Sequence, residues 1–192
     1  MEVREATLDD VERIRAIHCE AIVELASTAY DPEQIDAWVT PVETAEYKGI
    51  TDDDRYFVVA EANPEACETD DEEVETNGAT PNPDGELWKP NDDVIGFASV
   101  RFESPEGYES SVDADVTGVY VHPAVARKGV GSALLSEIER EAADRGIKTL
   151  GLEASINAVP FYGHHGYDRV RECVHSFGGR VDGPAIEMRK EL

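Results

Sequence analysis

Basic side chains are scarce in this chain. Its 192 residues include 17 lysines and arginines against 42 aspartates and glutamates, a formal net charge of −25. Nucleic acids and anionic membranes bind basic surfaces, so we expect neither as a partner. The three cysteines, Cys19, Cys67 and Cys173, are scattered and odd in number, which argues against a disulfide framework and for a reducing, cytoplasmic location. Apolar runs of transmembrane length are absent, and Met1–Glu5 lacks the basic and apolar segments of a signal peptide.

The acidity has several explanations. A disordered chain would have too little apolar content, whereas 41% of these residues are hydrophobic and fall into periodic segments. A cationic partner is a second explanation. We favour adaptation to a salty cytoplasm, where salt screens the self-repulsion, and the composition resembles that of haloarchaeal proteins.

The length predicts one domain over residues 1–192. Residues at about 62–93 form an acidic, polar stretch, which we interpret as an insertion in the loop between two strands. Its charge is most simply a solvated surface. Attraction of a cationic acceptor is the alternative.

The segment from Asp115 to Leu135 has the character of a strand, a loop and a helix start. Val119, Tyr120 and Val121 favour a strand, which His122-Pro123 ends. Four residues then lie where the helix would begin, namely Arg127, Lys128, Gly129 and Gly131. The free N–H groups of a helix start, glycines that permit close approach and two cations together predict a phosphate-binding cradle.

Several motifs compete for this cradle. A Walker loop requires Gly-Lys followed by Ser or Thr, which does not occur. A dinucleotide fingerprint would place its third small residue at Leu134 and lacks a second mononucleotide-binding half. A plain glycine-tolerant turn is also compatible. Residues 126–131 resemble motif A of the GNAT acyltransferases, Gln/Arg-x-x-Gly-x-Gly/Ala, although Ala126 departs from the first position.

A second motif covers Asn157 to Tyr167. It resembles the GNAT motif B pattern Asn-x-x-Ala-x-x-Phe-Tyr-x-x-x-Gly-Phe, with Pro160 and Tyr167 as departures. The resemblance implies acetyl-CoA as acyl donor and Tyr162 as the phenol that protonates the leaving thiolate. It implies donor contacts from Val119, Tyr120, Val121, Arg127, Lys128, Gly129, Val130, Gly131, Ser132, Asn157 and Phe161. We expect no metal, because adjacent histidines such as His164 and His165 face different ways on a helix.

The side-chain alternation in the central strand changes phase at Gly118. Val112, Ala114 and Val116 are apolar at one parity, but Val119 and Val121 continue at the other. A β-bulge shifts the phase by one residue, so we predict a bulge within residues 117–120. The GNAT fold has a bulge at this place, which splays two strands and frees N–H groups for the acyl carbonyl.

The expected fold is α/β, the GNAT fold, with a mixed central sheet of about six to seven strands and helices on both faces. Strands are predicted at 2–6, 55–61, 93–102, up to Val121, 147–154, 168–174 and 184–190. Helices are predicted at 9–25, from Asp31 through Trp38, and at 129–145.

The resemblance implies transfer of an acetyl group to a primary amine of a small molecule, by direct attack in a ternary complex. Asp115 is the first candidate for the base, followed by Glu153 and then His122. Tyr30, Trp38 and Glu153 are candidates for the acceptor pocket, with plain core packing as the alternative for the two aromatic residues. Two other functions remain open, a non-catalytic coenzyme A-binding regulatory module and a protein or peptide N-acetyltransferase. Monomer and homodimer are both compatible with the sequence.

Overall fold

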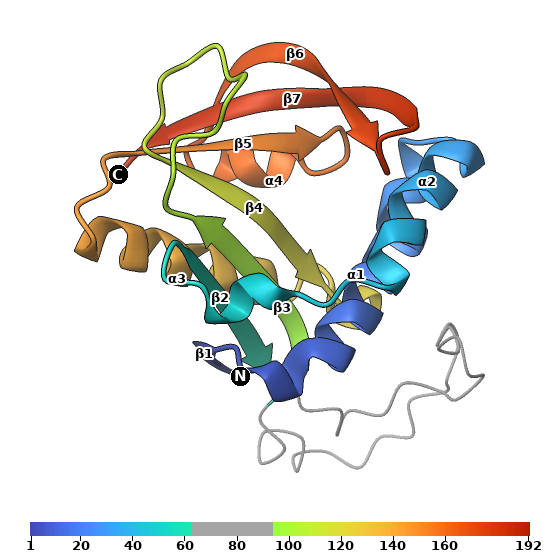
Figure 1. Cartoon of the computed structure of the whole chain (residues 1–192), viewed down its shortest axis with the longest axis horizontal. Coiled ribbons are helices and arrows are strands. Elements are labelled where there is room, and N and C mark those ends of the chain that lie inside the picture. The colour runs from blue at the N-terminus through green and yellow to red at the C-terminus, as the bar shows by residue number, and fades with distance from the viewer. Residues whose placement is uncertain (63–93) are drawn as a thin grey trace.

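The computed structural model describes residues 1–62 and 94–192, so the predicted acidic insertion lies almost wholly outside the described residues. In this part of the chain seven strands form one sheet in the order β1-β2-β3-β4-β5-β7-β6 (Figure 1). Only β4 and β5 run parallel, and every other pair is antiparallel. The bounds are β1 Glu2–Glu5, β2 Arg55–Glu61, β3 Val94–Arg101, β4 Ala114–Val121, β5 Thr149–Ser155, β6 Asp168–Phe177 and β7 Val181–Glu191. The predicted mixed sheet is confirmed.

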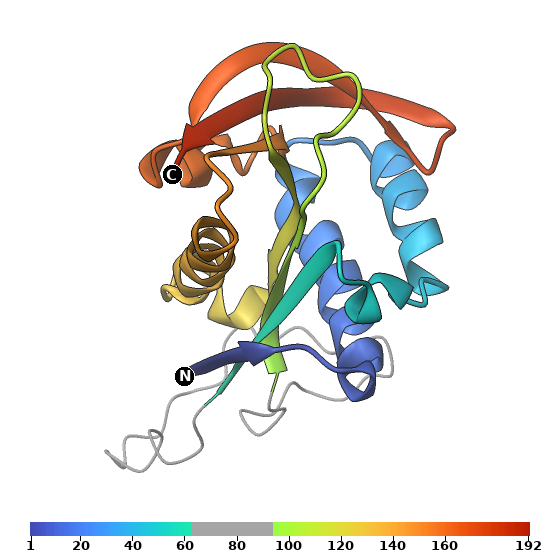
Figure 2. The same cartoon turned by 60° about the vertical axis from the view of Figure 1, so that its left-hand side comes forward.

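Helices cover both faces of the sheet, as the edge-on view in Figure 2 shows. The helices α1 (Val11–Leu25) and α2 (Pro32–Glu43) lie on one side, and α3 (Val130–Asp144) lies on the other. The short α4 (Val159–His164) packs into the same apolar cluster as α3. Helix α3 buries five side chains against the sheet, Val130, Leu134, Leu135, Ile138 and Ala142. No described helix has the length and apolarity that a membrane span requires.

Local sequence signals explain where α2 begins. The side chain of Asp31 accepts a hydrogen bond from the Gln34 backbone N–H at 2.9 Å, and the Gln34 side chain accepts one from the Asp31 N–H at 3.1 Å. This reciprocal pair satisfies two N–H groups that a helix start leaves without partners. Pro32 at the first helical position has no N–H to satisfy.

The predicted bulge lies in β4. Ser99 of β3 pairs with Gly118, while Val100 pairs with Val116, so Thr117 is the extra residue. The hydroxyl groups of Ser99 and Thr117 meet at 2.6 Å. The prediction of a bulge within residues 117–120 is therefore confirmed.

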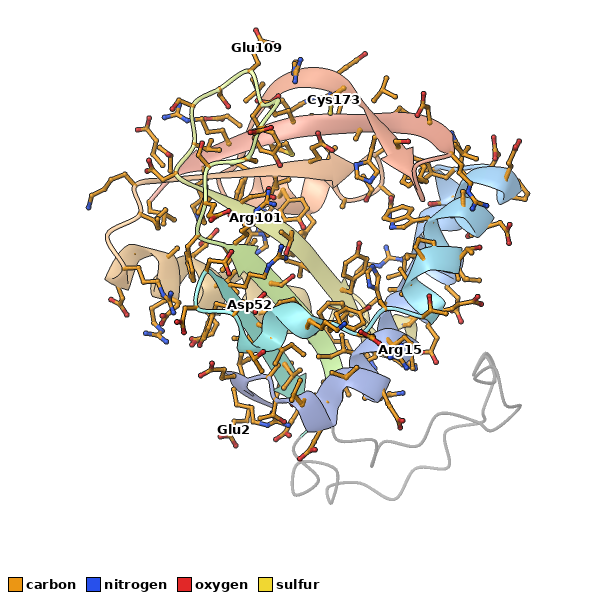
Figure 3. All side chains as sticks on the ribbon, in the orientation of Figure 1. Glu2, Arg15, Asp52, Arg101, Glu109 and Cys173 are labelled. Carbon is orange, nitrogen blue, oxygen red and sulfur yellow. The ribbon has the colours of Figure 1, made fainter. Side chains whose placement is uncertain are left out.

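One predicted connection differs from the structure. The loop predicted between residues 175 and 183 is mostly strand, because β6 continues to Phe177 and β7 resumes at Val181. The connection between β3 and β4 is a long loop over residues 102–113. It is anchored by Glu187 on β7, whose carboxylate accepts hydrogen bonds from the N–H groups of Glu109 and Ser110, each at 3.0 Å. Figure 3 shows Arg101 at the base of this loop and Glu109 at its outer end.

Arg4 joins β1, β2 and the start of α1. Its guanidinium group donates to both carboxylate oxygens of Asp10 at 2.8 Å and to Glu61 at 2.6 and 2.8 Å. Asp10 is buried, and the hydrogen bonds from Arg4 lower the pKa of its carboxyl group to about 2. A carboxyl group whose pKa is lowered by folding stabilises the fold above its unfolded pKa, and this stability is lost as the pH falls through the folded value.

We therefore predict that Asp10→Asn lowers the free energy of unfolding at pH 7 by about 2 kcal/mol. The difference between variant and parent should shrink as the pH falls from about 4 towards about 2, since Asp10 is then protonated in the parent as well. Urea titrations in molar potassium chloride at several pH values measure this. The exposed Asp36→Asn serves as a control. An equal difference at pH 7 and at pH 2 would contradict the ion-pair account.

Candidate functional site

The site is built around the separation of two parallel strands. In the described chain, β4 and β5 pair only at Ala114–Leu150 and Asp115–Gly151 and then part. The N–H of His122 donates to Ile95 of β3 at 2.9 Å. Because N–H groups alternate along a strand, those of Val119 and Val121 face the other edge, towards the opened gap. Two backbone donors are thus available between the strands.

The loop after β4 contains the residues that were predicted to form a phosphate-binding cradle. Gly129 caps α3 with φ of +87° and Arg127 has φ of +61°, both in the left-handed region. No atom lies within 4 Å of the place where a Cβ on Gly129 would be, so the backbone there is open to a ligand. Arg127, Lys128 and Gly129 are exposed at the start of a 15-residue helix. Their position, with the helix dipole, favours an anion.

A cavity of about 190 Å³ lies beside the cradle, between α1, β4 and α4. It contains many of the residues predicted to bind the donor. Its lining includes Val119, Tyr120, Val121, Gly131, Asn157, Phe161 and Tyr162, together with Trp38 and Ser155.

The other predicted donor residues lie at its rim or behind it. The Val130 side chain is buried in the core, so only its backbone is available. Ser132 meets His165 at 3.0 Å between Oγ and Nε2, which gives its hydroxyl a partner inside the protein. The Asn157 side chain donates to the carbonyl of Leu25 at 3.1 Å and thereby holds the end of α1 against the cavity.

Tyr162 lies on α4 with its ring buried against aromatic neighbours. Its centroid is 5.1 Å from that of Phe161 and 5.6 Å from that of Tyr167, both in edge-on arrangements. Its hydroxyl has no hydrogen-bonding partner among the described residues. Burial, with a smaller contribution from Tyr120, raises the pKa of the phenol above its ordinary value. The group is therefore a neutral hydrogen-bond donor at neutral pH.

A second cavity of about 240 Å³ adjoins the first. The two share Trp38, Tyr120 and Ser155. The remaining lining of the second cavity is His18, Tyr30, Thr117, Glu153, His175, Phe177 and Ala185. All three residues predicted for the acceptor pocket, Tyr30, Trp38 and Glu153, line it.

An aromatic cluster forms one wall of this second cavity. Trp38 is stacked on Phe177 with ring centroids 4.8 Å apart, and Tyr30 meets both rings edge-on. The Tyr30 hydroxyl donates to the carbonyl of Pro184 at 2.7 Å and accepts from the N–H of Ile156 at 3.0 Å. These contacts tie the aromatic wall to β7 and to the residue that follows β5.

Asp115 lies outside both cavities. Its carboxylate accepts a hydrogen bond from the Tyr108 hydroxyl at 2.6 Å and one from Arg101 at 3.1 Å. Burial raises the pKa of this carboxyl group, although both hydrogen bonds oppose the change. The structure thus does not bring Asp115 together with Tyr162. It gives Asp115 a role in holding the 102–113 loop, and catalysis by Asp115 stays an untested prediction.

The third candidate for the base is also engaged elsewhere. The His122 ring accepts a hydrogen bond from the Ala124 N–H at 3.2 Å, and its Nε2 lies 3.0 Å from Glu20 on α1. His122 is buried and lines neither cavity. This geometry agrees with a structural turn.

Two histidines of the second cavity, His18 and His175, are not among the residues predicted for the site. His18 meets the Tyr47 hydroxyl through Nδ1 at 2.8 Å, and its ring centroid lies 3.9 Å from that of Tyr120. Its Nε2 is buried and has no hydrogen-bonding partner in residues 1–62 and 94–192, and burial lowers the pKa of its ring to about 3. His175 meets Glu153 at 2.8 Å. Neither lies in a motif, and His18 shares the face of α1 that carries the buried Ile14 and Ile22, where the sequence indicates packing.

Within residues 1–62 and 94–192, no group of three or more histidine, cysteine or acidic side chains could hold a metal ion. Cys19 and Cys173 are free thiols in the part of the chain that the structure covers.

Comparisons with known proteins agree with this geometry. A family model described as the acetyltransferase (GNAT) family matches residues 61–167. No curated protein matches the sequence significantly. Among solved structures, a GCN5-related N-acetyltransferase from Rhodopseudomonas palustris is similar with a TM-score of 0.72 and 21% identity, covering 100% of this chain and 95% of that chain. The PaiA N-acetyltransferase from Thermoplasma acidophilum, solved in complex with coenzyme A, has a TM-score of 0.65 at 19% identity, covering 100% and 98%.

Proposed function

Because this chain belongs to the acetyltransferase (GNAT) family, we propose that it transfers an acetyl group from acetyl-CoA to a primary amine of a small molecule. One observation carries the proposal. Two cavities meet at Trp38, Tyr120 and Ser155, and one of them is lined by the buried Tyr162, whose hydroxyl has no partner among the described residues. Two substrates can therefore be bound side by side and react directly.

Acetyl-CoA would bind at the cradle and in the gap between β4 and β5. Backbone N–H groups near Gly129 and Gly131 suit the pyrophosphate, and Arg127 and Lys128 add charge at the rim. The thioester arm fits the cavity between β4 and α4, next to Phe161 and Asn157. Its carbonyl oxygen can accept hydrogen bonds from the N–H groups of Val119 and Val121, which would stabilise the charge that develops there.

The chemistry follows from the thioester. The amine nitrogen attacks the carbonyl carbon, the C–N bond forms, and the C–S bond breaks. Coenzyme A leaves as a thiolate, and Tyr162 supplies a proton to the sulfur. The acceptor enters as an ammonium ion, so it must release a proton before its nitrogen can attack.

The amine acceptor would bind in the second cavity. Its volume of about 240 Å³ suits a small molecule or the end of a side chain. Aromatic rings of Tyr30, Trp38 and Phe177 with the carboxylate of Glu153 form a surface that attracts an organic cation. An amine with an apolar body matches this combination.

We predict that Arg127→Glu weakens acetyl-CoA binding about tenfold, because the change removes one cation at the cradle and adds an anion. Calorimetric titration of acetyl-CoA at low ionic strength measures the affinity, and molar potassium chloride should reduce the difference because it screens the exposed charges. Arg169→Glu, an equally exposed reversal on β6, should leave it unchanged. Equal weakening in both variants would show that only overall charge matters.

We predict that Tyr162→Phe lowers kcat about 100-fold while acetyl-CoA affinity changes little, since the phenol acts on the leaving thiolate. Thiol release with a panel of primary amines gives kcat. Initial rates at varied concentrations of both substrates should give intersecting lines, as direct transfer requires. Acetyl-CoA binding without turnover by the wild-type protein would favour a non-catalytic coenzyme A-binding module instead.

A further inference from the structure

Glu153 and His175 form a carboxylate–imidazole pair inside the acceptor cavity. The Nδ1 atom of His175 lies 2.8 Å from a carboxylate oxygen of Glu153. An ionised carboxylate only accepts hydrogen bonds, so Nδ1 carries the proton and donates it. The lone pair of Nε2 is then the basic atom of the ring. A carboxylate that fixes the tautomer and supports the imidazolium is the arrangement that general-base histidines use.

The pair is assembled across an intervening strand. Glu153 lies on β5 and His175 on β6, and β7 runs between them. On this face of β7, Glu187 pairs with Glu153 and Gly183 pairs with His175. The position between them, Ala185, is small, so Ala185 and Gly183 leave the diagonal from Glu153 to His175 open. Larger residues there would separate the imidazole from the carboxylate. The His175 side chain is 46% exposed and the Glu153 side chain is 32% exposed, which leaves a path to solvent for a proton.

The other titratable groups near the acceptor cavity are less suited to this task. Asp115 is covered by Tyr108 and Arg101 and lines neither cavity. His18 lines the acceptor cavity, but burial lowers the pKa of its ring to about 3, so it holds a proton poorly. His122 is turned towards Glu20, outside the cavity.

We propose that His175 is the catalytic base of the reaction and that Glu153 is its positioning residue. The inference rests on the proposed acetyl transfer and identifies the group that accepts the proton from the acceptor ammonium. The sequence analysis ranked Glu153 itself as second candidate for the base. The geometry assigns it to holding the imidazole.

The proton and electron balance is complete within the ternary complex. The acceptor R–NH₃⁺ gives one proton to Nε2 of His175, which becomes an imidazolium paired with Glu153. The free nitrogen lone pair forms the new C–N bond, and the C–S bond breaks. The amine nitrogen then loses a second proton to the Tyr162 phenolate, which had given its own proton to the thiolate. His175 then returns its proton to solvent through its exposed edge.

The test uses His175→Ala, Glu153→Gln and the double variant in the full-length protein. Tryptamine, phenethylamine and cadaverine are screened as acceptors with acetyl-CoA, and the fastest is used throughout. We expect kcat to fall about 100-fold in His175→Ala and about tenfold in Glu153→Gln. The double variant should be no slower than His175→Ala, because Glu153 acts only through the ring. Imidazole added to His175→Ala should restore turnover.

Matched controls separate catalysis from folding. His164→Ala, an exposed histidine on α4, and Glu172→Gln, an exposed glutamate on β6, should retain wild-type kcat. Calorimetric affinity for acetyl-CoA should be unchanged in every variant, which verifies a folded donor site. A kcat within twofold of wild type in His175→Ala overturns the proposal, as does a loss that imidazole does not restore. A larger loss in Glu153→Gln than in His175→Ala would make Glu153 the base. Failure of the wild-type protein itself to turn over any amine would reject the acetyl transfer as well.

Discussion

The whole site depends on the point at which β4 and β5 stop pairing. Where β4 and β5 part after Asp115 and Gly151, the sheet loses hydrogen bonds that a continuous parallel ladder would have made. A sheet interior cannot leave such groups unsatisfied, so the opening is stable only if a ligand or solvent occupies it. The same opening lies at the carboxyl end of β4, where the chain turns into the cradle and α3 begins. Backbone donors and the positive end of a helix dipole therefore converge on one gap.

The bulge at Thr117 decides which side chains face that gap. With an unbroken alternation, Tyr120 would point to the α3 side of the sheet together with Val116. The extra residue instead turns it towards α1, where its ring stacks on Phe97 with centroids 5.3 Å apart and lies against His18. Gly118 is required for this arrangement, because a Cβ there would lie 2.5 Å from the Tyr120 ring. Tyr120 thus lines both cavities. The one-residue shift in register therefore places Tyr120 at the boundary between the proposed donor cavity and the proposed acceptor cavity.

What the sequence could reveal follows from how local each feature is. The cradle, the bulge and the α4 tyrosine depend on residues close together in the chain, so periodicity and motif sufficed to locate them. The length of the β6–β7 hairpin was mispredicted because Gly183 and Pro184 have the character of strand breakers. In the folded protein Tyr30 bonds the Pro184 carbonyl, and β7 continues through both residues. The Glu153–His175 pair and the Tyr108–Asp115 contact join separate strands or a strand and a loop. No spacing within one element encodes them, since they arise from the strand order and register of the finished sheet.

The acidity of the chain bears on how an anionic donor is held. A molecule of net charge −25 repels a phosphate-bearing ligand at long range, and two exposed cations at the cradle offset only part of that repulsion. High salt removes the repulsion, but it screens Arg127 and Lys128 as well, because the Debye length falls to about 3 Å at 1 M. Backbone N–H groups in contact with the ligand are not screened in this way. In a salty solution the glycine-lined backbone and the strand gap must therefore carry most of the recognition. The departure at Ala126 is consistent with this, since a cradle that binds through its backbone loses little when the first position of its motif contributes no side-chain contact.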